Sequence, residues 1–352
     1  MARVSPAPYL LGAVAGYLAD AALADPRRGH PVALFGSAAG RLERRLWRDH
    51  RGAGTAFTAL SVGAVAAGAA LADHALRRRP AARAALAAAA AWTVLGGTSL
   101  TREARTIGRS LEAGDLAAAR GRLPHLCGRD PSALDEQQIA RAVVESVAEN
   151  TADAVVNALT WGALAGTPGL LAFRAVNTLD AMVGHRSARH LRFGWASARL
   201  DDVAGWPGAR LTALLTVAAA EHPRAARRVW RRDGSSHPSP NAGQAESAFA
   251  GGLGVRLGGT LQYGERVEHR PVLGAELRPV AVADIERACR LSRRVGVLAL
   301  AVTTAAHALG RTALGRATRG RTGPVGAPER RTLAAGTAVL TAGATRKQGS
   351  VT

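Results

Sequence analysis

The sequence predicts an all-α, polytopic integral membrane protein whose polar loops face the cytoplasm. Of its 352 residues, 47% are hydrophobic but only 4% are aromatic. The apolar residues are mostly Ala, Val and Leu, which favour closely packed helices over a sheet-based core. Long apolar stretches with arginine-rich flanks add the membrane signal, because a spanning helix needs about 20 predominantly apolar residues.

Two apolar stretches, residues 54–71 and 84–100, are the clearest candidates for spanning helices. A basic turn at residues 77–83 separates them, so together they predict a membrane hairpin. Their Gly, Ala and Ser residues would let neighbouring helices approach closely. The alternative is a pair of buried helices in a soluble protein. A third candidate covers residues 295–309, and weaker ones cover residues 8–23, 155–173 and 211–220.

Arginine-rich segments at residues 41–51 and 102–122 flank this hairpin. By the positive-inside rule, both flanks face the cytoplasm and the turn between the helices faces outward. The turn is itself basic, which weakens the orientation signal. We expect a multi-pass protein of the cell membrane whose functional site faces the cytoplasm.

The net charge of +20 comes almost entirely from arginine, since Lys347 is the only lysine. Such an excess suits nucleic acid, an anionic lipid surface or phosphorylated substrates. The arginines flank apolar segments and are not interleaved with aromatic residues, so we expect no nucleic-acid partner. Because Lys347 stands in a Gly/Thr-rich tail, covalent catalysis through a lysine is disfavoured. The isolated Cys127 and Cys289 indicate neither a zinc site nor a disulfide framework.

The chain is predicted to contain one membrane-embedded domain, residues 1–310, followed by a basic tail, residues 311–352. The tail mixes Arg, Gly, Thr and Pro without sustained periodicity. Such a composition predicts a flexible segment that carries no chemistry.

The segment VVESVAENTADAVVNAL places Glu145, Glu149, Asp153 and Asn157 at intervals of four residues, on one face of a helix. Like charges at this spacing destabilise a helix, so a positive group should compensate them. One hypothesis is a Mg²⁺ ion held by one or two of the acids while it bridges a phosphate. The alternatives are a solvated polar face and an acidic stripe paired to arginines.

The segment FRAVNTLDAMVGHR places Asn177 and Asp180 on one helical face, and Gly184 is expected to end that helix. His185 and Arg186 would then stand at the mouth of a pocket. There the imidazole could move a proton and the guanidinium could hold a phosphate or a propionate. The alternative is that both residues only cap the helix.

The segment ADPRRGHPVALFG forms a loop with Asp25, Arg27 and His30 directly after an apolar helix. Loops of this kind position reactive groups, but the same charges could anchor the chain at the membrane surface. Similarly, the adjacent Asp201 and Asp202 could bind a cation or begin the following helix.

A Pro/Ser-rich turn, a helix and several glycines follow in the stretch SHPSPNAGQAESAFAGGLGVRLGG, which includes Asn241 and Glu246. This stretch resembles a loop that encloses a substrate. The alternative is that its glycines serve helix packing, since no P-loop lysine is present.

Taken in order over about residues 10–310, these segments resemble the motifs of the CobD/CbiB family. The quoted motifs are ADPRRGHPVALFG, VESVAENTADAVVNAL, TPGLLAFRAVNTLDAMVGHR, RFGWASARLDDVAGWPGARLTA, SPNAGQAESAFAGGLGVRLGG and YGERVEHRPVLG. The resemblance implies an integral membrane adenosylcobinamide-phosphate synthase. Such an enzyme joins adenosylcobyric acid to (R)-1-amino-2-propanol, or to its O-phosphate, through an ATP-dependent amide bond.

The resemblance also implies roles for individual residues, with ATP and Mg²⁺ as cofactors. Glu145, Glu149 and Asp153 would bind Mg²⁺, and Glu149 and Asp153 would also be catalytic. His185 or His30 would deprotonate the attacking amine. Phosphates or the acidic arm of the corrin would bind to Arg27, Arg174 and Arg186. Further substrate contacts are expected from Asp25, Asn177, Asp180, Asn241 and Glu246.

The expected partners are the corrinoid, the amine, the lipid bilayer and other enzymes of the corrin pathway. Two positions depart from the family pattern: Gln244 replaces a common aromatic, and Asn157-Ala158 replaces Ala-Pro. A non-catalytic membrane scaffold is the alternative function, although three acids stacked on one helix would be costly for a scaffold. If residues 155–173 crossed the membrane fully, the two polar motifs would lie on opposite sides, so we expect a re-entrant or buried helix there.

Overall fold

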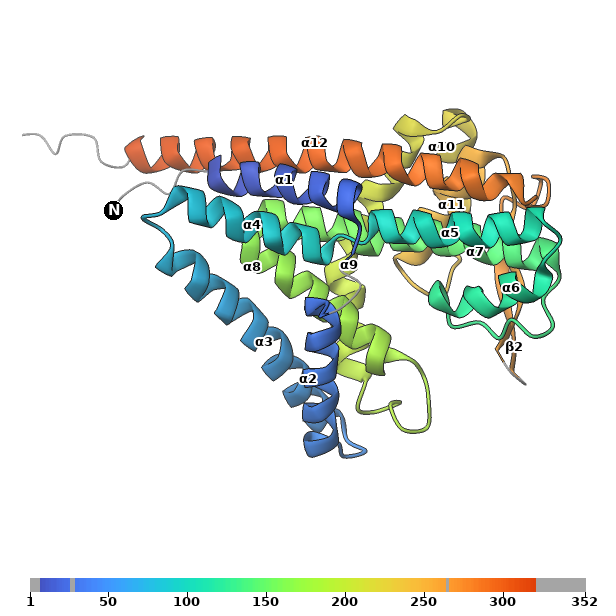
Figure 1. The fold of residues 1–352 in the computed structure, drawn as a ribbon, viewed down its shortest axis with the longest axis horizontal. Coiled ribbons are helices and arrows are strands. Elements are labelled where there is room, and N and C mark those ends of the chain that lie inside the picture. The colour runs from blue at the N-terminus through green and yellow to red at the C-terminus, as the bar shows by residue number, and fades with distance from the viewer. Residues whose placement is uncertain (1–6, 26–28, 264–265, 321–352) are drawn as a thin grey trace, which may run out of the picture. The chain divides into compact units, whose positions relative to one another are not determined.

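The computed structural model describes residues 7–25, 29–263 and 266–320, and it confirms a predominantly helical architecture (Figure 1). One antiparallel β-hairpin interrupts the helices. The chain divides into two units, Met1–Arg311 and Thr312–Thr352. The first unit contains every element that bears on the functional site.

The first half of the chain forms α1 (Ala7–Leu23), α2 (Pro31–Leu46), α3 (Arg51–Ala75), α4 (Pro80–Val94), α5 (Gly97–Glu112), α6 (Leu116–Arg122), the short 3-10 helix η1 (Leu123–His125) and α7 (Glu136–Thr151). The second half forms η2 (Ala152–Val156), α8 (Asn157–Leu179), η3 (Asp180–Gly184), α9 (Trp195–Ala219), α10 (Pro223–Asp233), α11 (Ala242–Leu253), β1 (Leu257–Tyr263), β2 (Arg266–Leu273) and α12 (Ala283–Gly320). Both η2 and η3 are π-helical turns.

Small residues let α4 pack closely against α1, whereas α3, its expected partner in the predicted hairpin, packs mainly against α8. A Cβ atom placed on Gly12 of α1 would lie 2.5 Å from the Cβ of Ala87 on α4. One turn further along α1, Gly16 faces Ala91 in the same way. Because neither glycine has a side chain, the two backbones can approach closely, an arrangement that is common between membrane helices.

Three helical segments in the described part of the chain are long and apolar enough to cross a membrane: Arg51–Ala75, Pro80–Glu112 and Glu136–Gly184. The first two contain the predicted spans at residues 54–71 and 84–100. The protein is therefore a membrane protein. Its outward-facing leucines, which include Leu60 and Leu71 on α3, suit contact with lipid because more than half of their surface is exposed.

The third predicted span, residues 295–309, is not one of these three segments. It lies within α12, and its apolar run of 15 residues is short of the roughly 20 needed to cross the hydrocarbon. The weaker candidate at residues 8–23 became α1, a shorter apolar helix. The remaining one, residues 211–220, lies in α9, which carries Asp201 and Asp202 near its start.

The helix α8 bends back on itself at Gly166, whose φ of 67° and ψ of −154° lie outside the helical region. Pro168 follows directly, and a Cβ on Gly169 would lie 2.3 Å from the carbonyl oxygen of Trp161. Residues eight positions apart meet in this way only if the chain reverses, since they lie about 12 Å apart along a straight helix. The chain reversal that the predicted re-entrant helix requires is therefore present in α8.

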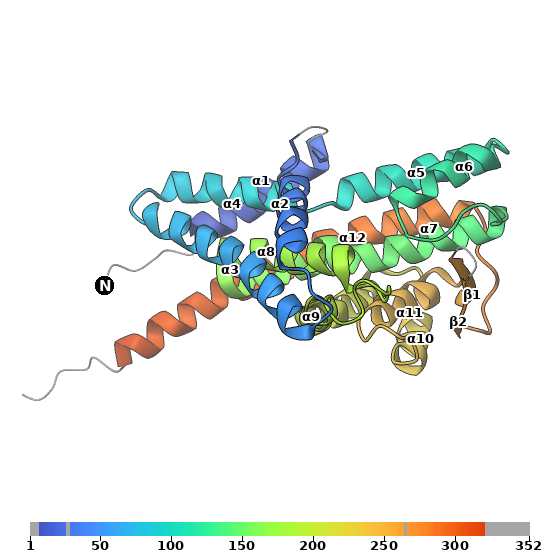
Figure 2. The same ribbon diagram turned by 90° about the horizontal axis from the view of Figure 1, so that it is seen from below.

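The β-hairpin packs against α7 and α11. Figure 2 shows the two strands beside these helices. Its register pairs Leu257 with Leu273 and contains a β-bulge between Gly258 and Gly259. The hairpin was not predicted, because the glycine-rich stretch was interpreted as a loop. Glycines are disfavoured in strands except where a bulge or close backbone approach requires them.

The predicted tail begins as helix, because α12 continues from Ala283 to Gly320. The sequence placed the start of the flexible tail at Arg311. Residues 321–352, which make up most of that tail, lie outside the described part of the chain.

Substitution of Gly166 tests the reversal of α8. Only glycine adopts its backbone conformation readily, so Gly166→Ala should lower the stability by about 1–3 kcal/mol. Thermal unfolding of the purified protein in detergent would measure this loss. The control is Gly63→Ala on the exposed face of α3, where a Cβ meets nothing within 4 Å and alanine favours the helix. Equal melting temperatures for the two variants would contradict the assignment of the reversal to Gly166.

Candidate active site

Four carboxylates from separate segments form what we call the acidic centre: Glu149, Asp153, Asp180 and Asp201. They belong in turn to α7, η2, η3 and α9. The charges of the other three all act on Asp153, although 27 residues separate it from Asp180. A straight α8 of 23 residues would hold its two ends roughly 34 Å apart. The reversal at Gly166 is therefore what brings Asp153 and Asp180 together.

The two aspartates at the ends of α8 both lie in π-helical turns. A π-helical turn contains an extra residue, which changes the direction of the side chains that follow, and such turns are frequent at functional sites. A Cβ on Gly184 would overlap the carboxylate of Asp180, so this position has no space for a side chain. Local backbone irregularity thus positions both acids.

Amide side chains contact the carboxylates of the acidic centre. The Nδ2 atom of Asn157 lies 3.5 Å from Oδ1 of Asp153, and Nδ2 of Asn177 lies at the same distance from Oδ1 of Asp201. Asn157 is fully buried against α9, and within the described residues its Oδ1 atom accepts no hydrogen bond. The centre therefore contains an oxygen acceptor with no donor of its own.

Arg174 provides a positive charge that acts on Asp153 of this centre. The charges of Asp25 and Asp153 both act on its guanidinium. Its Nε atom is buried and, within the described chain, donates to no acceptor. The structure thus brings Arg174, Asn177 and Asp180 to the acidic centre, as the sequence-based hypothesis of a shared site requires.

The acidic centre combines burial with access from outside. Glu149 keeps an exposed side chain, and Asp153, Asp180 and Asp201 are each partly exposed. Burial raises the pKa of Asp201 to about 7, with further contributions from the charges of Asp180 and Asp202. A carboxylate with a pKa near neutrality can exchange a proton at physiological pH.

The centre has the donor types that a hard cation prefers but does not form a closed metal cage. Among residues 7–25, 29–263 and 266–320, no three His, Cys, Asp or Glu side chains are arranged to hold a metal ion. Mg²⁺ is usually bound by one or two carboxylates together with water and substrate phosphates. The unpaired Oδ1 of Asn157 beside Asp153 fits such a partial site.

Glu145 does not belong to this centre, which corrects its predicted role as a metal ligand. Its carboxylate forms a buried ion pair with Arg129 and accepts the backbone N–H of Gly258 at 2.7 Å. Arg141 lies next to it, with Nε 3.9 Å from Oε1. For this residue the alternative of an acid paired to arginines is confirmed, because both of its oxygens are already occupied.

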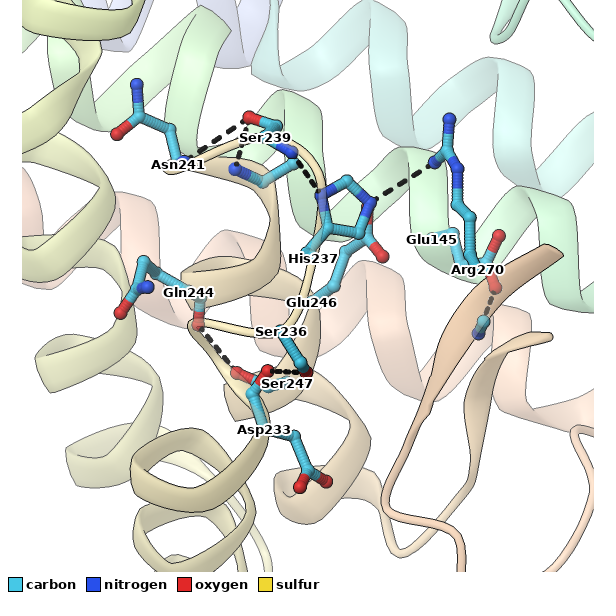
Figure 3. Close-up of polar contacts among 12 residues, drawn as sticks. Glu145, Asp233, Ser236, His237, Ser239, Asn241, Gln244, Glu246, Ser247 and Arg270 are labelled. Atoms are coloured by element: carbon cyan, nitrogen blue, oxygen red, sulfur yellow. Dashed lines mark hydrogen bonds and ion pairs between the residues drawn. The ribbon is translucent and has the colours of Figure 1, made fainter. Parts of the chain in front are cut away.

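A second buried cluster, not identified from the sequence, contains His237, Glu246 and Arg270. Figure 3 shows His237 between the other two residues, with Nε2 3.2 Å from Nη1 of Arg270 and 3.9 Å from Oε1 of Glu246. Its Nδ1 atom accepts the backbone N–H of Ser239. Burial raises the pKa of Glu246 well above its usual range, and the charges of Glu145 and Glu149 add to this effect.

Asn241 and Gln244, at the start of α11, form hydrogen bonds with other protein groups. Asn241 donates to the carbonyl oxygen of Asp202 at 2.8 Å and accepts from Arg210 at 3.1 Å. Gln244 accepts from the Trp230 indole and donates to the carbonyl of Gly234, each at 2.8 Å. Gln244, which departs from the family pattern, thus links α11 to α10 through these two hydrogen bonds.

His30 caps a helix, a role that the sequence did not predict for its loop. Its Nδ1 accepts the backbone N–H of Val32 at the start of α2. The other nitrogen, Nε2, lies 3.6 Å from Asp25. Arg27 lies outside the described residues.

His185 contacts a different group from the acidic centre. Its Nε2 lies 3.4 Å from Nδ1 of His190, and Nε2 of His190 lies 3.2 Å from Glu43 on α2. Arg186 is exposed. The charges that act on Asp153, Asp180 and Asp201 come from other residues, so these two residues have no demonstrated link to the acidic centre.

The raised pKa of Asp201 makes stability depend on pH. An unfolded aspartate has a pKa near 4, so the folded state binds the Asp201 proton more tightly than the unfolded chain does. Stability should therefore fall as the pH rises from about 4 through about 7. Asp201→Asn should flatten this dependence and stabilise the protein at pH 8 by on the order of 1 kcal/mol, since one pKa unit corresponds to about 1.4 kcal/mol. Melting temperatures at pH 5 and pH 8 would test this, with Asp49→Asn at an exposed carboxylate as the control.

The two buried glutamates should respond differently to neutralisation. Glu246→Gln should cost little stability, because the raised pKa of Glu246 shows that its environment disfavours the charged form. Glu145→Gln should destabilise the protein by about 3 kcal/mol or more, since it breaks the buried ion pair with Arg129. Thermal unfolding of both variants would measure the contrast. A larger loss for Glu246→Gln than for Glu145→Gln would overturn this view of the two sites.

Comparison with known proteins identifies the family. Residues 13–292 match the family model described as CobD/Cbib protein. The chain is 52% identical over 300 residues to the cobalamin biosynthesis protein CobD of Mycobacterium tuberculosis, covering 83% of this chain and 94% of that protein. It is 42% identical over 286 residues to the cobalamin biosynthesis protein CobD of Pelobacter propionicus, covering 79% and 88%. No solved structure matches. The chain therefore belongs to the CobD/CbiB family of cobalamin biosynthesis proteins.

Proposed function

We propose that this protein joins the carboxylate of adenosylcobyric acid to the amino group of (R)-1-amino-2-propanol, or of its O-phosphate, in a reaction driven by ATP. Membership of the CobD/CbiB family supports a corrinoid substrate. The observation that carries the proposal is the acidic centre, in which α7, η2, η3 and α9 bring four carboxylates into one partly exposed place.

The reaction needs activation because a carboxylate is a poor acyl donor. In the proposed first step, a carboxylate oxygen of the corrinoid attacks the γ-phosphorus of ATP and ADP leaves. The amine nitrogen then attacks the acyl carbon of the resulting acyl phosphate. Inorganic phosphate leaves with the electron pair of the broken C–O bond, and the amine loses a proton as the amide forms.

The acidic centre suits cations because its like charges must be compensated. Four neighbouring carboxylates cannot all ionise without positive partners. Among the described residues, the charge of Arg174 acts on Asp153. The charges of Arg270 and Arg129 act on Glu149. We propose that Glu149 and Asp153 hold Mg²⁺ together with phosphate oxygens. When bound, Mg²⁺ would neutralise the phosphate charge that develops during the transfer.

We further propose that Asp201 accepts the proton of the amine. Its pKa of about 7 suits a group that takes up a proton at physiological pH. The residues first considered for this role have other contacts, since His30 caps α2 and His185 contacts His190. Asn177, whose amide lies 3.5 Å from Asp201, would orient the carboxylate.

Arg174 is proposed to bind the acidic arm of the corrinoid or a phosphate, since a guanidinium forms strong paired hydrogen bonds with either group. Its buried Nε, which donates to no acceptor among the described residues, leaves such a bond available. Because ATP is a cytoplasmic substrate, we propose that the acidic centre faces the cytoplasm of a cell-membrane protein.

Substitution of Asp153 tests the proposed function. Membranes containing the protein should form the amide from adenosylcobyric acid, ATP, Mg²⁺ and one of the two amines. Asp153→Asn keeps the size of the side chain but removes a charge at the reacting centre, and should lower the rate by 100-fold or more. Product formation would be followed by mass spectrometry, and chelation of Mg²⁺ should abolish it.

The control is Asp49→Asn, which neutralises an exposed carboxylate outside the acidic centre. This variant should keep the wild-type rate. Absence of product with either amine, from membranes shown to contain folded protein, would instead favour the non-catalytic scaffold. Equal rates for Asp153→Asn and the wild type would exclude the acidic centre as the reacting site.

A further inference from the structure

A separate pocket of about 220 Å³ lies where the β-hairpin meets α7. It is lined by Gln137, Arg141, Arg256, Leu257, Gly258, Gly259 and Val272. The lining includes two arginines and no acidic residue. The pocket is smaller than the roughly 300–1,000 Å³ of a site for a drug-sized ligand, so it suits a small group or one end of a larger molecule.

The guanidinium of Arg141 is fixed in place by the hairpin. Its Nη1 donates to the carbonyl oxygen of Gly258 at 2.7 Å, and its Nη2 donates to that of Thr260 at 2.9 Å. The nearest carboxylate, Glu145, lies 3.9 Å from Nε and is already bonded to Arg129 and Gly258. Arg141 therefore keeps positive charge that no close hydrogen bond to a carboxylate neutralises.

Arg256 adds a second positive charge on the same pocket. Its side chain is exposed, and no carboxylate pairs with it among the residues that the structure describes. The charge of Arg256 acts on Arg141, so the two guanidinium groups lie close together despite their repulsion. Two like charges that face one pocket favour the binding of an anion between them.

Glycines keep the wall of this pocket open. Gly258 and Gly259 have φ angles of 78° and 91°, which side chains rarely allow, and they flank the β-bulge. A Cβ on Gly259 would lie 3.3 Å from Nη1 of Arg141. The hairpin backbone can therefore approach the guanidinium closely, with no side chain to cover it at this position.

We propose that this pocket binds a phosphate group through Arg141 and Arg256. A phosphate offers several oxygens to two guanidinium groups and carries enough charge to compensate both. The phosphate could belong to a nucleotide or to a phosphorylated amine, and both share this chemistry. Phosphate binding by this pocket is independent of the proposed function. Only the identity of the molecule that carries the phosphate rests on that function.

The pocket is connected to the acidic centre through α7. Arg141, Glu145 and Glu149 follow one another at intervals of four residues on this helix, so they share one face. Gly258, which lines the pocket, donates to Glu145. A ligand with a phosphate at one end could therefore bind here while its other end extends along this face toward Glu149.

Binding of pyrophosphate to the full-length protein in detergent tests the proposal. Titration calorimetry in the presence of EDTA would exclude binding through a divalent cation at the acidic centre. Arg256→Gln should weaken pyrophosphate binding at least 10-fold, because it removes one charge without disturbing the hydrogen bonds of Arg141 to the hairpin. The matched control is Arg224→Gln on the exposed side of α10, which should bind like the wild type.

Competition then separates the two sources of the phosphate. Displacement of pyrophosphate by ATP alone would assign the pocket to the nucleotide, and displacement by aminopropanol phosphate alone would assign it to the amine. Equal affinities for Arg256→Gln and the wild type, with both proteins folded, would overturn the proposal. Loss of pyrophosphate binding in Arg256→Gln would support it even in a protein that forms no amide, so the two proposals can fail separately.

Discussion

The reversal of α8 at Gly166 is the constraint on which the acidic centre depends. Asp153 and Asp180 stand at the two ends of one long helical segment, and only a chain that turns back brings their charges together. A single glycine conformation therefore determines which polar groups can act on one substrate. The reversal also brings together the polar residues at both ends of α8, which a straight helix would hold far apart.

This arrangement places like-charged carboxylates close together, where they repel one another. Glu145 and the acids of the acidic centre differ in how their charge is compensated. Glu145 is neutralised within the fold by Arg129 and the N–H of Gly258. In the acidic centre, the charge of Arg174 acts on Asp153, and those of Arg270 and Arg129 act on Glu149. Neither Asp180 nor Asp201 forms an ion pair within the part of the chain that the structure describes. Stability alone would favour pairing all of these acids, so the two aspartates without an ion pair among the described residues support the cationic ligand that we propose.

The sequence predicted the helical class, two of the spans and the acidic stripe, because composition and four-residue spacing are local properties. The stripe could not show that Glu145 pairs with Arg129, since their pairing depends on how the chain folds between them. Nor could spacing reveal the π-helical turns that redirect Asp153 and Asp180. His237 had no detectable signal because it lies in an irregular Pro/Ser-rich turn, and its contact with Arg270 comes from a hairpin that was interpreted as a loop.

Along α7 the charge changes sign, from Arg141 at the pocket to Glu149 at the acidic centre, with the neutralised Glu145 between them. The eight residues from Arg141 to Glu149 span roughly 12 Å of helix. Two sites of opposite charge at such a separation favour a ligand that carries a phosphate at one end and a cation at the other. The phosphorylated amine carries both charges, but only two carbons and one oxygen separate its nitrogen from its phosphorus, so it is too short to contact both sites at once. A longer phosphorylated molecule could reach from the arginines to Glu149, so the length of α7 between the two sites favours an extended ligand over a short one.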